Sequence, residues 1–202
     1  MISKPTHDVV AASVAAYSSH AAAYDSANAG LMAPQRARFI ASLAPAAAVL
    51  DAGCGPGRDL RAFREAGLNA VGLDLNETFC AMAARHGPVT LGDLRHLPYA
   101  GASFAGVWSC ASLVHLPPEA VSVSLAEMAR VLVPAGQMYV SVKLGDVSGW
   151  RDSAHGTRWF STWHPQVFCD LVAASGFVVD ATAPVTGRSD TFLDLWAHKP
   201  SV

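Results

Sequence analysis

The sequence predicts an α/β protein with a mostly parallel sheet that carries helices on both faces. Short apolar runs alternate with helical patterns along the chain, and this alternation is typical of parallel strands joined by right-handed crossovers. Hydrophobic residues make up 51% of the 202 positions and charged residues 15%, which is ample for a core covered on both sides. A glycine-rich turn between a strand pattern and a helix pattern adds a ligand-binding feature to this fold class.

The individual elements follow in chain order. The patterns predict helices over 7–24, 33–43, 57–66, 76–86, 118–132 and 164–175. They predict strands over 47–51, 69–74, 88–92, 104–109, 136–143, 176–184 and 190–198, and a long loop over 144–163. At this length we expect one domain.

The segment from Val49 to Asp59 is the most informative part of the chain. It reads Val-Leu-Asp-Ala-Gly-Cys-Gly-Pro-Gly-Arg-Asp, so an apolar strand ends in Asp51 and glycine then occupies every second position. Such a crossing leaves backbone N–H groups and a helix N-terminus open to a ligand. A dinucleotide site would need a third glycine where Arg58 stands, and a P-loop would end in Gly-Lys-Ser/Thr, which this loop lacks.

Two further strand patterns also end in an acid. Asp74 ends the second strand, where a carboxylate can accept both ribose hydroxyls of a bound adenosine, and Asp93 ends the third. Each acid, taken alone, could instead cap the helix that follows it.

These motifs, in this order, resemble those of class I S-adenosylmethionine-dependent methyltransferases. Residues 51–57 are similar to the first motif of the family, Asp-x-Gly-x-Gly-x-Gly, and residues 104–116 resemble its fourth strand and the turn after it. Residues 130–140 resemble the Arg-Val-Leu-Lys-Pro-Gly-Gly entry to strand five. The chain departs from the family at Asn76, where serine is common, and at Ala135, which replaces a glycine.

The resemblance implies a Rossmann-like, seven-stranded sheet with a C-terminal antiparallel hairpin whose last strand inserts into the sheet. It divides the domain into a helical lid segment (1–44), a cofactor-binding core (45–145) and an acceptor-side part (146–202). It also implies S-adenosyl-L-methionine as cofactor and S-adenosyl-L-homocysteine as product. The implied cofactor-binding residues are Asp51, Gly53, Cys54, Gly55 and Gly57 at the methionine end, Asp74 and Leu75 at the ribose and adenine, Asp93 and Leu94 at the adenine edge, and Ser109 and Cys110 after strand four.

The acceptor should approach from segments beside the cofactor, at the carboxyl ends of the strands. The candidate acceptor-side residues are Tyr17, Tyr24, Trp150, Trp159, Phe160, Trp163 and His164. The rings in the long loop could form a pocket wall or lid, or simply cover the end of the sheet. His115, just beyond strand four, is the candidate general base, and its alternative role is to pack against or cap the helix that starts near Pro118.

Composition narrows the partners and the compartment. A net charge of −2 without a basic run argues against nucleic acid, and no apolar run is long enough for a membrane span. The N-terminal apolar run is short and alanine-based, which fits a helix better than a signal peptide. The four cysteines show no spacing typical of a metal site or a disulfide framework, so we expect a cytoplasmic protein with no bound metal. The oligomeric state stays open.

These observations favour methyl transfer to an oxygen, nitrogen or sulfur atom of a small molecule. A non-catalytic module that binds the adenosyl cofactor is one alternative. An NAD-linked oxidoreductase is another, disfavoured by the missing third glycine.

Overall fold

A computed structural model describes residues 6–28, 30–152, 156–187 and 190–201. The helices are α1 Thr6–Ser18, α2 Ala21–Asn28, α3 Ala33–Ala41, α4 Arg58–Glu65, α5 Glu77–Ala83, α6 Pro118–Val131 and α7 Pro165–Ala174, with a 3₁₀ turn, η1, at Leu113–His115. The strands are β1 Ala48–Ala52, β2 Asn69–Asp74, β3 Val89–Leu91, β4 Phe104–Cys110, β5 Leu132–Leu144, β6 Gly149–Arg151, β7 Arg158–Phe160, β8 Thr162–Trp163, β9 Val178–Thr186 and β10 Thr191–His198.

One sheet organises the molecule, with strand order β3-β2-β1-β4-β5-β10-β9. Strands β3, β2, β1, β4 and β5 run parallel, and β10 is antiparallel to both β5 and β9. The predicted seven-stranded, mostly parallel sheet with an inserted C-terminal hairpin is therefore confirmed. A short eighth strand, β8, adds to it by pairing with the end of β5.

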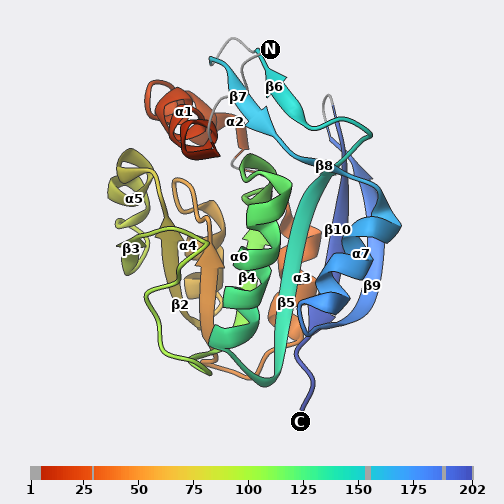
Figure 1. Cartoon of the computed structure of the whole chain (residues 1–202). Helices are drawn as coiled ribbons and strands as arrows, with labels where there is room; N and C mark the ends of the chain where they lie inside the picture. The colour runs from red at the N-terminus through yellow and green to blue at the C-terminus, as the bar shows by residue number, and fades with distance from the viewer. Residues whose placement is uncertain (1–5, 29, 153–155, 188–189, 202) are drawn as a thin grey trace.

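Helices cover both faces of this sheet (Figure 1). On one face α6 and α7 bury residues such as Leu125 and Phe168 against the central strands. On the other face α3 and α4 contribute Phe39 and Phe63, which pack around the fully buried Trp108 of β4. Helices α1 and α2 and the hairpin β6–β7 lie at one end of the sheet, and Figure 1 shows them together above the central strands.

Three predicted elements were wrong in extent. The single helix expected over 7–24 is broken, because Ser18 and Ser19 turn their hydroxyls onto the carbonyls of Val14 and Ala16 and compete with the helical backbone. Strand β5 begins at Leu132, earlier than the predicted residue 136, because Leu132 already pairs with Phe104 before an irregularity in the ladder.

The third correction concerns 144–163, which is not a plain loop. It contains the antiparallel pair β6–β7, in which Trp150 lies opposite Trp159, and then β8. The two indole rings meet edge to face with centroids 6.0 Å apart, a cross-strand aromatic contact that favours pairing of these short strands. Among the described residues, no helix is long and apolar enough to cross a membrane.

Candidate functional site

The glycine loop between β1 and α4 has a backbone that side chains would disfavour. Gly53, Gly55 and Gly57 all have positive φ, at 85°, 53° and 95°. A Cβ on Gly53 would lie 2.3 Å from the Cβ of Ser112, and one on Gly57 would lie 2.9 Å from the Cα of Ala83. A Cβ on Gly55 would meet nothing within 4 Å. Two glycines therefore permit close packing of the loop, and the third leaves open space beside the cavity that it lines.

Asp74, at the end of β2, accepts a hydrogen bond from the backbone of this loop. Its Oδ2 accepts a hydrogen bond from the N–H of Gly55 at 2.8 Å, and its Oδ1 accepts one from the N–H of Asn76 at 2.8 Å. Burial raises the pKa of Asp74, and these backbone donors act in the opposite direction. The carboxylate lines the same cavity as the loop, and each of its oxygens can accept a further hydrogen bond from a ligand.

Asp51 lies in β1, directly before the glycine loop, and is only 2% exposed. Its Oδ2 has no hydrogen-bond partner among the described residues. Burial and the neighbouring Asp59 carboxylate raise the pKa of Asp51 well above its usual range, while Arg58 favours the charged form. A buried, unpartnered carboxylate oxygen is costly, so this atom fits a site that receives a cationic donor from a ligand.

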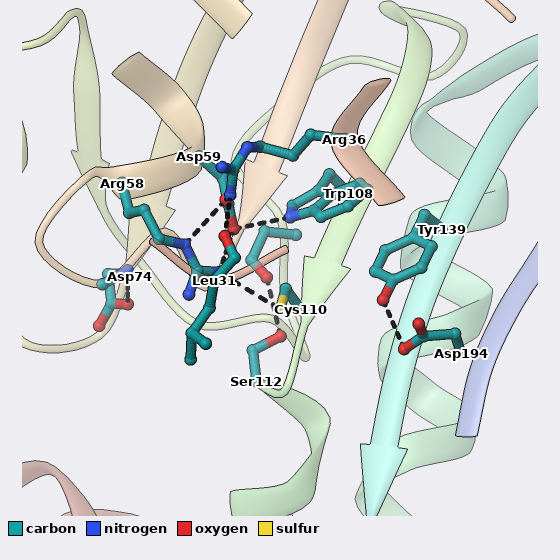
Figure 2. A network of polar contacts seen from close by, with 12 residues as sticks. Leu31, Arg36, Arg58, Asp59, Asp74, Trp108, Cys110, Ser112, Tyr139 and Asp194 are labelled. Atoms are coloured by element: carbon teal, nitrogen blue, oxygen red, sulfur yellow. Dashed lines mark hydrogen bonds and ion pairs between the residues drawn. The ribbon is translucent and has the colours of Figure 1, made fainter. Parts of the chain in front are cut away.

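A buried ionic network joins α3, α4 and β4 beside this carboxylate (Figure 2). The Asp59 carboxylate accepts from Arg36 at 2.6 Å, from Arg58 at 2.6 Å and from the indole N–H of Trp108 at 2.9 Å. Sequence analysis missed this network. An acid in the first helical turn after the loop was visible, but its partners Arg36 and Trp108 come from distant elements.

A main cavity opens at the carboxyl ends of β1, β2 and β4, with a volume of about 120 Å³. The predicted site residues that line it are Tyr17, Tyr24, Gly53, Gly55, Asp74, Leu75, Asp93, Leu94, Cys110 and His115. A smaller adjoining cavity is lined by Cys54 together with Arg58 and Asp59. Three predicted cofactor residues, Asp51, Gly57 and Ser109, are buried and do not line either cavity.

The turn after β4 closes the cavity next to the glycine loop. The Ser112 hydroxyl donates to the carbonyl of Ala52 at 2.8 Å and lies 2.6 Å from the hydroxyl of Ser109. Between them Ala111 adopts a positive φ of 51°, which is unusual for a residue with a side chain. Backbone strain of this kind concentrates at ligand sites, where the surrounding structure holds it in place.

The residues predicted to contact adenine, Leu75, Asp93 and Leu94, differ in exposure and in their partners. Leu75 is 37% exposed at the edge of the cavity, and Leu94 is partly buried against the core. The Asp93 carboxylate is occupied by its neighbour Arg95, whose guanidinium reaches Oδ2 at 2.5 Å and Oδ1 at 2.9 Å. A ligand amino group would share Asp93 with that guanidinium.

His115 lies in η1 between α1 and β7. Its Nε2 is 2.8 Å from the hydroxyl of Tyr17, and its Nδ1 is 2.8 Å from the carbonyl of Trp159. The ring of Phe160 packs against the imidazole with centroids 4.9 Å apart. Burial lowers the pKa of His115 to about 4, and the cations Arg158 and Lys143 add to that effect.

Helix α1 is fastened over this site by polar contacts that the sequence did not indicate. The Asn76 side chain caps α5 by accepting from the N–H of Phe79 at 3.1 Å and donates to the carbonyl of Val14 at 3.0 Å. The N–H of Trp159 donates to the Ser13 hydroxyl at 3.3 Å. The cavity-lining residues that sequence analysis did not select are Val10, Ser13, Val14, Asn76, Phe79, Gly92, Ala111, Ser112 and Leu116.

The remaining aromatic candidates do not line the main cavity. Trp150 and Trp159 pair within the hairpin, and Trp163 is buried against Phe168 in the core. The exposed His164 imidazole lies 3.2 Å from the Asp146 carboxylate. Whether any of them meets an acceptor stays a prediction.

The residues of this site belong to a segment that is similar to known proteins. Residues 49–136, which hold the glycine loop, Asp74, Asp93 and the turn after β4, match the family model described as a methyltransferase domain. This segment is a methyltransferase domain. The resemblance seen in the motifs is thereby confirmed for the part of the chain that carries them.

The fold of the methyltransferase domain and its flanking elements recurs in a solved structure. The 1,6-didemethyltoxoflavin-N1-methyltransferase of Burkholderia thailandensis, solved with 1,6-didemethyltoxoflavin and S-adenosylhomocysteine, superposes with a TM-score of 0.82. It is 24% identical in sequence, and the alignment covers 99% of this chain and 92% of that one. At this identity the likeness concerns the fold.

Curated relatives match about half of this chain. The malonyl-[acyl-carrier protein] O-methyltransferase of Erwinia billingiae is 37% identical over 48% of this chain and 39% of its own length. A 24-methylenesterol C-methyltransferase 2 of rice (Oryza sativa subsp. japonica) is 34% identical over 48% of this chain and 29% of its own length. The chain thus spans well under half of these relatives, whose acceptors differ from each other.

Proposed function

We propose that the chain binds S-adenosyl-L-methionine and transfers its methyl group to an oxygen, nitrogen or sulfur atom of a small molecule. The observation that carries this proposal is the placement of one buried and one partly buried carboxylate around one glycine loop. Asp51 offers an unpartnered oxygen behind the loop, and Asp74 lines the cavity in front of it.

The residues present fit this cofactor. Asp51 is suited to the methionine ammonium through a bridging water, because its orphaned oxygen needs a hydrogen-bond donor while the residue itself does not line the cavity. Asp74 is suited to the ribose hydroxyls, since its oxygens retain acceptor capacity beside the loop. Leu75 and Leu94 offer apolar surface to a flat base at the cavity edge. When bound, the cofactor supplies an activated methyl group, so the chain's own task is to orient the acceptor and exclude water.

Acceptor size follows from the remaining lining. With α1 closed over the site, the apolar and aromatic part of the cavity lining includes Val10, Val14, Tyr17, Tyr24 and Phe79. This space suits a small molecule better than an extended chain. The Burkholderia thailandensis enzyme was solved with a small molecule, 1,6-didemethyltoxoflavin, whereas the relative from Erwinia billingiae is named for a malonyl-[acyl-carrier protein] substrate.

Calorimetry tests the cofactor assignment. We expect S-adenosylmethionine and S-adenosylhomocysteine to bind with micromolar affinity, and NAD not to bind. A labelled-methyl screen over small heterocycles, phenols, amines and thiols then tests transfer. Binding of NAD without binding of either adenosyl ligand would contradict the proposal, and binding without transfer to any acceptor would leave a non-catalytic module.

A further inference from the structure

The hydrogen bonds around His115 define which of its nitrogens carries the proton. A backbone carbonyl can only accept, so the contact between Nδ1 and the carbonyl of Trp159 places the proton on Nδ1. In the neutral ring Nε2 is then an acceptor, and the Tyr17 hydroxyl donates to it at 2.8 Å. In this hydrogen bond the Tyr17 phenol on α1 is therefore the donor and the His115 imidazole in η1 is the acceptor.

The groups around His115 keep its imidazole neutral and so preserve the direction of this hydrogen bond. Arg158 lies with its guanidinium 4.7 Å from the centre of the Tyr17 ring and 5.4 Å from that of Phe160, and Lys143 Nζ lies 4.4 Å from the centre of Phe160. Burial and, to a smaller extent, these cations disfavour an imidazolium in the resting site, so His115 is neutral and Nε2 is available as an acceptor. Burial raises the pKa of Tyr17, the charge of Arg158 and a hydrogen bond from its side chain lower it, and the Asp74 charge raises it.

Both members of the pair line the main cavity, beside Gly53, Gly55 and Asp74. When α1 is closed over the site, its hydrogen bonds with Asn76 and Trp159 set the position of the phenol. Tyr17 thus reaches the cavity with its oxygen already bonded to a base, and an acceptor placed there would meet the phenol oxygen.

We infer that Tyr17 is a catalytic residue, the outer member of a two-step proton relay with His115, and that the acceptor is a heteroaromatic N–H or an enolic or phenolic O–H compound. This rests on the proposed methyl transfer. The acceptor heteroatom gains the methyl group, the bonding pair of the broken carbon–sulfur bond stays on sulfur, and the heteroatom loses one proton. That proton passes to the Tyr17 oxygen while the phenol proton passes to Nε2 of His115. The imidazolium formed replaces the positive charge that the sulfonium loses, so the net charge of the site is unchanged.

The acceptor class follows from the weakness of this base. A buried imidazole with two cations nearby is too weak a base to deprotonate an aliphatic ammonium ion, so we do not expect aliphatic amines, which are protonated in water, as acceptors. A ring N–H or an enol becomes acidic enough as its new bond to carbon forms.

The test uses the full chain with S-adenosylmethionine and a defined panel. The panel holds 1,6-didemethyltoxoflavin, uracil-type and pteridine-type N–H heterocycles, simple phenols, and aliphatic amines such as putrescine. We expect transfer to at least one heterocycle or phenol and to no aliphatic amine. Transfer to aliphatic amines only, or to no panel member by a protein that calorimetry shows to bind the cofactor, overturns the acceptor class. Failure to bind the cofactor would instead overturn the proposed function.

Variants then test the relay itself. Tyr17→Phe and His115→Gln should each lower kcat about a hundredfold with the cofactor Kd unchanged, and the double variant should be no slower than the slower single one, as expected for two groups acting as a unit. Tyr99→Phe is the matched control, because it removes a hydroxyl bonded to Thr90 outside the site and should leave kcat unchanged. Equal kcat in Tyr17→Phe and the parent, or multiplicative losses in the double variant, would overturn the relay.

Nitrogen-15 NMR of the imidazole gives a readout independent of any acceptor. The parent at pH 7 should show a neutral ring protonated at Nδ1, and Tyr17→Phe should shift the Nε2 resonance toward that of an unbonded nitrogen. A ring protonated at Nε2, or an imidazolium at pH 7, would overturn the inference.

Discussion

At the residue scale, the geometry of the site depends on glycines that allow close contacts with neighbouring residues. Gly53 lets the loop pass against Ser112, whose hydroxyl in turn holds the carbonyl of Ala52. A side chain at that position would force apart the two turns that frame the cavity.

Gly53→Ala should therefore cost about 2–4 kcal/mol of unfolding free energy, from strain at positive φ and from the clash with Ser112. Gly67→Ala is the control, since Gly67 has a similar φ of 81° with nothing within 4 Å of an added Cβ, and it should cost only about 1 kcal/mol. Urea unfolding of both variants checks this. Equal losses of unfolding free energy in the two variants would mean that Ser112 moves away from the added methyl group without a measurable cost.

Asp74 carries a second residue-scale prediction. Asp74→Asn keeps one carbonyl oxygen for the loop and removes the charge, so S-adenosylhomocysteine should bind about 10- to 100-fold more weakly. Calorimetry measures this, with Asp180→Asn on β9 as a control that should leave affinity unchanged. An unchanged affinity in Asp74→Asn would assign Asp74 to loop support alone.

Single residues were also where sequence reasoning reached its limit. The glycines and strand-end acids are local patterns, so Gly55 and Asp74 could be selected from the sequence. Asp59 could not, because its partners Arg36 and Trp108 become neighbours only when α3 and β4 pack on α4. Arg158 was missed for the same reason.

At the element scale, most strands and helices could be predicted because their burial follows local periodicity. Strand β2 occupies 69–74 as expected, and α6 ends within one residue of its predicted end. The hairpin β6–β7 could not be predicted, since its pairing depends on cross-strand contact between two indoles rather than on a repeating pattern.

Helix α6 carries a pH-dependent contact with the segment before β4. The Glu127 carboxylate accepts from Arg130 at 2.7 Å and from the N–H of Leu97 at 2.8 Å, and Arg130 holds its pKa down at about 2, from an ordinary 4.5. A depressed carboxyl pKa stabilises the fold above the unfolded value, and this contribution is lost as pH falls from about 4.5 to 2.

Glu127→Gln should therefore lower the unfolding free energy by about 1 kcal/mol at pH 7, because the pair is partly exposed. The difference from the parent should shrink toward zero near pH 2. Denaturant titrations at pH 7 and pH 3 measure it. A difference that stays constant between these pH values would contradict the assignment.

At the scale of the whole molecule, a rigid sheet supports a thinner cover made of α1 and the β6–β7 hairpin. The cover meets the rest of the fold through a few polar contacts, including those of Tyr17 with His115 and Asn76 with Val14. A cavity of about 120 Å³ is small for an adenosyl ligand, so the cover must move for ligands to enter.

Hydrogen exchange should show this motion. Without ligand, amides of α1 and β7 should exchange faster than those of β1 and β4, whose strands are buried on both faces. S-adenosylhomocysteine at about a hundred times its Kd should slow exchange in α1 by up to about a hundredfold, equivalent to about 2.7 kcal/mol. Exchange in α1 as slow as in β4 before ligand is added would contradict a mobile cover.

The antiparallel insertion of β10 has a consequence for how the protein is made. During synthesis, β1 to β5 and the glycine loop leave the ribosome first. One edge of β5 stays unpaired until β10, which lies much later in the chain, has been made. Until β10 arrives, the Tyr139 hydroxyl lacks its 2.6 Å bond to Asp194 and the buried Lys143 ammonium lacks its 2.7 Å pairing with Asp190. The nascent chain therefore carries an unpaired strand edge beside an uncompensated charge, which disfavours premature closure of the core around β5 and exposes that edge to chaperones or to another nascent copy.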